Sequence, residues 1–150
     1  MPEWVSDAEL DVWLSIMGET LRLVNHLDER LVHEHGISYA EFRTMISIAR
    51  EGPQRMSDLA QEGMVSRSGI SRQVARLVDL GHVEQFTETS DGRTRFVRLT
   101  EQGLDLVTKA SSNHFARIRE HVFDQLESGE MHVLSTVFGK VGASLTHALQ

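Results

Sequence analysis

Hydroxyl and guanidinium side chains gather in one stretch of the chain, residues 66–98. Its first part carries three serines and three arginines: Ser66, Arg67, Ser68, Ser71, Arg72 and Arg76. Its last part carries Arg93 and Arg95 just after the pair Asp91-Gly92. Such side chains donate hydrogen bonds to phosphate oxygens, and arginine can also donate two bonds to the edge of a guanine. The residue types therefore predict recognition of a polyanion, and double-stranded DNA is the first candidate.

The charge distribution supports a localised anion-binding surface. The whole chain carries a net charge of −7, which opposes binding to nucleic acid. Residues 66–98 nevertheless hold six arginines against four acidic residues, so this stretch is positive and the remainder of the chain is strongly negative. Asymmetry of this kind within one chain indicates one anion-facing element, although a solvated charged surface is the commoner cause of a single cluster.

Composition excludes several other classes of protein. The chain has 150 residues, 40% of them hydrophobic and 25% charged, which is typical of one globular domain. It has no cysteine, so thiol catalysis, thiol redox sensing and cysteine-ligated zinc are excluded. No apolar run approaches the roughly 18 residues of a membrane span, and the N-terminus lacks a signal-peptide pattern. We expect no membrane partner and a cytoplasmic location.

Hydrophobic spacing and capping residues predict the elements that must position these side chains. Apolar residues at helical spacing predict one long helix over residues 7–35, ended by Gly36. Ser38 and Glu41 form a capping box for a second helix, which Gly52-Pro53 ends. A third, short helix is expected to begin at Ser57, and Ser66 is expected to cap a fourth helix that runs to about residue 80.

The next segment changes to the spacing of β-strands. Residues 83–89 and 95–99 are rich in β-branched and aromatic residues, and Asp91-Gly92 between them is a strong hairpin-turn signal. Thr100 is expected to cap a fifth helix over 101–122, and a last helix is expected over 130–149. The order predicts a mainly α fold with a small β-hairpin wing (α+β), namely a winged helix-turn-helix flanked by long N- and C-terminal dimerisation helices.

The fourth helix has one apolar and one polar face. Its apolar side is expected to hold Ile70, Val74, Leu77 and Val78, and its outer side Ser68, Arg72, Ala75, Arg76 and Asp79. Small hydroxyl residues and arginines on the outer face suit a helix that enters the major groove of DNA, and the arginines of the hairpin suit the minor groove. The alternative is an amphipathic surface helix with ordinary solvated arginines.

The chain resembles the MarR family of bacterial transcription regulators. The resemblance is carried by the segment from Leu59-Ala60 to Val83-Glu84, and by the motif Asp91-Gly92-Arg93 followed by Leu99-Thr100-Glu101-Gln102-Gly103. It departs at Gly69, where relatives more often carry a better helix former. The resemblance implies a homodimeric repressor in which residues 1–36 form an N-terminal dimerisation helix, 37–100 the DNA-binding module and 101–150 C-terminal dimerisation helices, together one compact domain.

The same resemblance implies a palindromic operator and release from DNA by a small aromatic or phenolic ligand. The residues expected to bind such a ligand are His26, Arg30, Tyr39 and Arg43, where an arginine beside apolar surface could accept a carboxylate. The alternative is that these residues simply pack a hinge.

Two further functions remain open at this point, and an enzyme is not expected. Eight histidines invite a metal-responsive regulator, but His33 and His35 point to different faces of a helix and no His-x-x-x-His pair exists. A helical protein-interaction dimer without DNA binding is the other alternative. The chain lacks a Gly-rich phosphate loop, a nucleophile elbow and a metal-ligand helix motif, so we expect no catalysis, no cofactor and no metal site.

Overall fold

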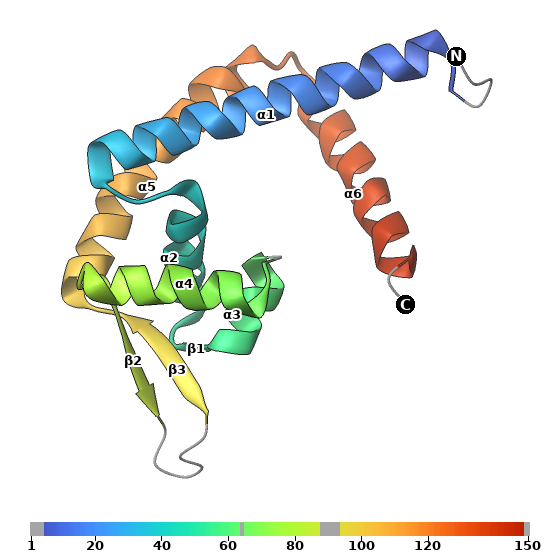
Figure 1. Cartoon of the computed structure of the whole chain (residues 1–150). Helices are drawn as coiled ribbons and strands as arrows, with labels where there is room; N and C mark the ends of the chain where they lie inside the picture. The colour runs from blue at the N-terminus through green and yellow to red at the C-terminus, as the bar shows by residue number, and fades with distance from the viewer. Residues whose placement is uncertain (1–4, 64, 88–93, 149–150) are drawn as a thin grey trace. The chain divides into compact units, whose positions relative to one another are not determined.

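The computed structural model describes residues 5–63, 65–87 and 94–148, and the side chains among them up to residue 146. Helices dominate it. In chain order the elements are α1 (Asp7–His35), α2 (Tyr39–Glu51), β1 (Gln54–Arg55), α3 (Met56–Gly63), α4 (Arg67–Asp79), β2 (Val83–Thr87), β3 (Arg95–Leu99), α5 (Glu101–His121), the 3-10 helix η1 (Phe123–Gln125) and α6 (Glu130–Ala148) (Figure 1). The predicted fold class, mainly helical with a small β wing, is confirmed.

The wing is one residue pair richer than a hairpin. Strands β2 and β3 pair antiparallel from Val83 opposite Leu99 to Thr87 opposite Arg95. A third strand, β1, pairs with the other edge of β3 and gives the sheet order β1-β3-β2. Two residues are too few for a hydrophobic alternation, so the sequence did not predict β1. The strand joins α2 and α3 to the base of the wing (Figure 1).

One apolar core holds the helix-turn-helix together. It is formed by side chains from α1, α2, α3, α4, α5 and the two long strands. Its fully buried members include Phe42 and Met45 of α2, Val74 and Leu77 of α4, and Val97 of β3. Each buried side chain of this size contributes about 1.5–3 kcal/mol of transfer free energy. The core therefore fixes the orientation of α4 relative to α2 and the wing.

Capping residues define most of the helix ends as expected. The Ser38 hydroxyl accepts from the backbone N–H of Glu41, whose carboxylate accepts from the backbone N–H of Ser38. Ser66 caps α4 by accepting from the backbone N–H of Gly69 at 3.0 Å. The expectation for Ser57 was wrong: α3 begins one residue earlier, at Met56, and the Ser57 hydroxyl donates to Asp58 instead.

The start of α5 lies against the turn that follows α4. The backbone N–H of Thr100 donates to the carbonyl of His82, and the Thr100 hydroxyl donates to the carbonyl of Gly81 while accepting from the backbone N–H of Gly103. A Cβ on Gly103 would lie 1.9 Å from the His82 carbonyl oxygen. Only glycine fits at this contact.

Two apolar surfaces are exposed, one on each of the two compact units into which the chain divides, Met1–His114 and Phe115–Gln150. In the first unit the N-terminal half of α1 exposes Trp13, Leu14, Met17 and Leu21. In the second, α6 exposes a row of large side chains, namely Val133, Leu134, Val137, Phe138, Val141 and Leu145. Within the residues that the structure describes, no helix is long and apolar enough to span a membrane.

Candidate nucleic-acid interface

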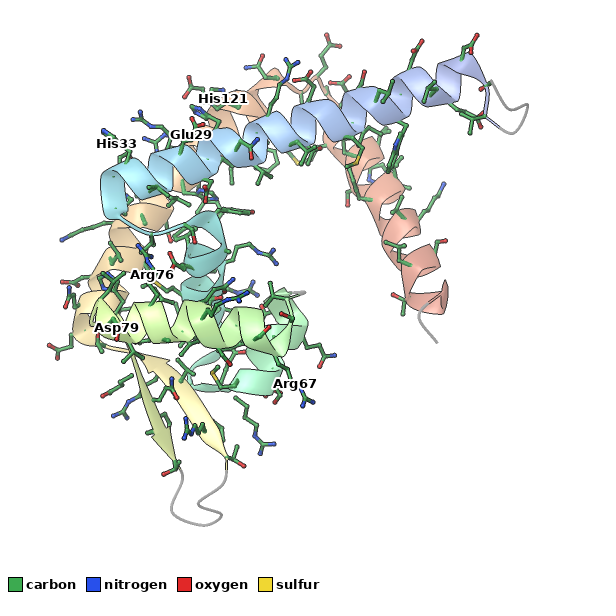
Figure 2. The ribbon with its side chains drawn as sticks, viewed as in Figure 1. Glu29, His33, Arg67, Arg76, Asp79 and His121 are labelled. Carbon is green, nitrogen blue, oxygen red and sulfur yellow. The ribbon has the colours of Figure 1, made fainter. Side chains whose placement is uncertain are left out.

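A hollow separates the start of α4 from the wing. Its volume is about 640 Å³. Three of the residues predicted to bind DNA line it, Arg67 and Ser71 from α4 and Arg95 from β3. Figure 2 shows Arg67 at the N-terminal end of α4. The hollow is thus bounded by a helix and a strand that both present cations to the same space.

Two residues that the sequence did not single out also line this hollow. Ser57 contributes a hydroxyl from the first turn of α3, and Gln85 an amide from β2. Gln85 lies opposite Val97 in the sheet. Because strand residues alternate between the two faces of a sheet, a reading of the strand pattern could have assigned Gln85 to an exposed face. Ser57 was expected only as a helix cap.

The exposed arginines of this surface are available to a ligand. Arg67, Arg72 and Arg95 are exposed, and in the part of the chain that the structure describes none of them forms an ion pair. The predicted residue Arg93, with Asp91 and Gly92, lies outside the described residues.

The serines at the start of α4 already make local hydrogen bonds. The Ser66 and Ser68 hydroxyls lie 3.0 Å apart, and the Ser71 hydroxyl donates to the carbonyl of Arg67 at 2.8 Å. All three side chains are exposed, and a hydroxyl has one donor and two acceptor sites. Their predicted contacts with phosphates remain compatible with these bonds and remain a prediction.

Arg76 differs from the other predicted arginines. Its Nη1 donates to both carboxylate oxygens of Glu41, at 2.7 and 2.6 Å, and its Nη2 donates to the carbonyl of Gly36 at 3.0 Å. The side chain of Glu41 is only 6% exposed. The guanidinium therefore connects α4 to the junction between α1 and α2 (Figure 2). We call the group of Arg76, Glu41 and the Gly36 carbonyl the α4 clamp.

The base of the wing carries two more arginines over aromatic rings. Arg98 forms an ion pair with Glu84 at 2.7 Å and lies over the ring of Phe86. Arg55 lies 5.6 Å from the centre of the Phe96 ring. Both side chains are exposed, so these contacts add little stability, but they hold the guanidinium groups against the strands.

The four residues predicted to bind a small ligand do not form one site. Tyr39 and Arg43 line a separate cavity of about 290 Å³ between α2, α3 and α4. Neither His26 nor Arg30 lines it, and Arg30 forms an ion pair with Glu34 one turn further along α1. The described residues contain no group of three or more histidines and acidic residues that could hold a metal ion.

The imidazole of His82 is buried beside the α4 clamp. Burial lowers the pKa of His82 from its ordinary value of 6.5, the positive charge of Arg76 lowers it further, and Glu41 acts in the opposite direction. Its Nδ1 is buried and has no hydrogen-bond partner in the described part of the chain. His82 is therefore expected to be neutral in the folded protein at pH 7.

This shift predicts an acid-dependent loss of stability. Because the unfolded histidine binds a proton more readily than the folded one, the free energy of unfolding should decrease as pH falls from above 6.5 toward the lower folded pKa. We expect urea denaturation to show a larger loss between pH 7.5 and pH 5.5 in the parent than in His82→Gln, whose amide does not titrate. Equal losses in both proteins would contradict a role for His82.

The helix-turn-helix, the three-stranded wing and the basic hollow between them define a winged helix-turn-helix protein, a class whose second helix commonly enters the major groove of DNA. Comparisons with known proteins are consistent with this class. Residues 35–94 match the model of the MarR family. A Bacillus cereus protein named as an HTH-type transcriptional regulator is 26% identical over 130 residues, which cover 87% of this chain and 86% of that protein.

Two solved structures from Streptomyces coelicolor superimpose on nearly the whole chain. AbsC, a MarR family transcriptional regulator, has a TM-score of 0.90 and 26% identity, covering 97% of this chain and 99% of its own. Sco3205, a MarR family transcriptional regulator solved in complex with DNA, has a TM-score of 0.90 and 28% identity, covering 97% and 92%. The chain belongs to the MarR family of transcriptional regulators.

Proposed function

We propose that this protein is a sequence-specific DNA-binding repressor that acts as a homodimer on a palindromic operator and is released by a small aromatic ligand. The observation that carries the proposal is the hollow between α4 and the wing, where Arg67, Ser71 and Arg95 converge. The exposed Arg72 lies one residue after Ser71 on the same helix. The similarity to Sco3205, solved with DNA, supports this choice of ligand.

In the proposed complex, α4 lies in the major groove. Arg72 donates two hydrogen bonds to a guanine, and Arg67, Arg95 and the serines hold phosphates of the flanking backbone. The negative charge of the remaining chain limits binding to DNA through other surfaces.

The apolar faces of α1 and α6 support the homodimer. Each carries large side chains that are about half exposed in the single chain, such as Trp13 and Leu14 on α1 and Val137 and Phe138 on α6. Contiguous apolar surface of this kind marks protein–protein contacts. A second copy of the chain would bury both faces.

Selection of bound duplexes from a random DNA pool at near-physiological salt tests the proposal. We expect a palindrome whose half-sites lie about 34–36 Å apart, one helical turn, because the two-fold symmetry of a dimer places its two recognition helices at that spacing. The selected operator placed beside a promoter should reduce transcription when the protein is added. An asymmetric site would contradict the homodimer, and a pool without enrichment would contradict sequence-specific binding.

Substitution of two arginines separates base reading from backbone binding. Arg72→Ala is expected to cost about 1–3 kcal/mol of operator affinity and to relax the preference at one base position. Arg95→Ala is expected to weaken binding to all sequences alike and to reduce the dependence of affinity on salt, because fewer counterions are released. Anisotropy titrations at several salt concentrations measure both effects. Parent-like binding of both variants would show that these side chains do not contact DNA.

A further inference from the structure

The cavity between α2, α3 and α4 combines an apolar wall with polar groups from three helices. Its volume is about 290 Å³, close to the lower end of the range of about 300–1,000 Å³ for small-molecule sites. It shares no lining residue with the hollow beside the wing. The apolar wall consists of Tyr39 and Ile46 from α2, Leu59 from α3 and Val65. A body the size of one aromatic ring fits such a wall.

The charges around this cavity favour an anion. Arg43 and Arg50 line it from α2, and Glu62 from α3 carries the one opposing charge among the described lining residues. Arg43 forms no ion pair with any residue that the structure describes. Arg50 is 3.8 Å from Glu51 in an exposed pair, which is a weak interaction. A carboxylate would give Arg43 a bidentate partner.

The polar groups of the wall connect the recognition helix to its support. The Thr44 hydroxyl lies 3.1 Å from the side-chain carbonyl of Gln73 and joins α2 to α4. The Ser47 hydroxyl donates to the carboxylate of Glu62 and joins α2 to α3. A ligand hydroxyl in the cavity would compete for these partners, because Glu62 and Gln73 both accept hydrogen bonds.

We propose that this cavity binds a small ring-containing carboxylate with a hydroxyl group, and that Arg43 holds its carboxylate. The hydroxyl takes over an acceptor that Thr44 or Ser47 now uses, which loosens α4 from α2. The binding step stands on the cavity alone, whereas the expected effect on DNA rests on the proposed function. The site differs from the set predicted from the sequence, because it lies against α3 and α4 and excludes His26 and Arg30.

Binding is tested on the full chain without DNA, with benzoate and 4-hydroxybenzoate as probes and benzamide as the uncharged control. In a methyl NMR titration we expect both carboxylates to shift the signals of Ile46, Leu59 and Val65, and benzamide to leave them unchanged. Arg43→Gln should weaken binding of 4-hydroxybenzoate about tenfold, which corresponds to about 1.4 kcal/mol. Lys109→Gln, which removes a charge from an exposed position of α5 outside the cavity, should change it less than twofold.

The outcomes separate this site from the proposed function. Absence of methyl shifts with both carboxylates, equal shifts with benzamide, or parent-like binding by Arg43→Gln would overturn the site. Release of selected operator DNA by 4-hydroxybenzoate, lost in Arg43→Gln, would support the loosening of α4, and binding without release would overturn it. Failure to select any operator would contradict the proposed function, and the methyl titration would still decide whether the cavity binds carboxylates.

Discussion

Gly103→Ala is expected to destabilise the protein by at least about 3 kcal/mol. The added methyl group would lie 1.9 Å from the carbonyl oxygen of His82 and 2.8 Å from its carbonyl carbon. Overpacking typically costs about 1–3 kcal/mol when side chains can move aside. A backbone carbonyl that accepts a hydrogen bond from Thr100 cannot move without breaking that bond and shifting α5, so a cost at the upper end or beyond is expected.

Urea denaturation followed by circular dichroism measures this change, with Gly18→Ala as the matched control. Gly18 also lies inside a helix, and a Cβ there meets nothing within 4 Å in the chain. Alanine has the higher helix propensity, so the control should be neutral or stabilised by up to about 1 kcal/mol. A Gly103→Ala protein as stable as the parent would show that the close contact between α5 and the α4–β2 turn is not maintained in solution.

The role of Gly103 could not be worked out from the sequence by spacing. Glycine two residues into a predicted helix lowers helix propensity, and its sequence neighbours give no reason for it. The reason is a backbone atom of His82, which tertiary packing brings to the start of α5. The same limit applies to Asp28, which interrupts the apolar stripe of α1. Its carboxylate accepts from the backbone N–H of Tyr39 at 2.6 Å and so caps α2 from a different helix.

The elements themselves were largely predictable because their signals are local. Ser38 with Glu41, Ser66 and Thr100 fixed the helix starts, and the change from helical to alternating spacing fixed β2 and β3. The errors fall where tertiary contacts decide. β1 exists only through its pairing with β3. Val78, expected in the core, is 38% exposed because the core side of α4 is filled by its neighbours Val74 and Leu77.

The predicted DNA surface divides in the same way. A helical wheel places Arg72 and Arg76 together on the outer face of α4, but it does not contain α2. Only the structure reveals that the guanidinium of Arg76 is held by a buried carboxylate, whereas Arg72 is exposed. The two arginines therefore make opposite predictions about stability, and the larger effect belongs to Arg76.

Arg76→Ala and Glu41→Ala are each expected to lower the free energy of unfolding by about 1–3 kcal/mol. Loss of Arg76 leaves the Glu41 carboxylate, 6% exposed, without its cation. Water screens part of this cost because the Arg76 side chain is 52% exposed. Loss of Glu41 removes the capping box as well. The double variant should cost less than the sum of the single variants, since the two residues form one interaction.

The exposed pair of Arg98 and Glu84 is the matched control. Its nitrogen–oxygen distance is the same 2.7 Å that joins Arg76 to one Glu41 oxygen, but both partners are about half exposed. Arg98→Ala should therefore change the free energy of unfolding by less than about 1 kcal/mol. If the Arg76 and Arg98 variants lose equal stability, the burial of Glu41 is not what makes the α4 clamp strong.

Operator affinity of the same variants distinguishes a clamp from a direct DNA contact. If the clamp positions α4, Arg76→Ala and Glu41→Ala should weaken operator binding by similar factors and leave the base preference unchanged, because both release the same helix. If Arg76 contacts DNA, only its own substitution should weaken binding, and Glu41→Ala should leave affinity unchanged or raise it by freeing the guanidinium. We expect the first result, since three hydrogen bonds already hold that guanidinium on the α1–α2 side of the helix. Arg76→Lys should recover part of the stability, because an ammonium keeps the charge opposite Glu41 but not the fork that also reaches Gly36.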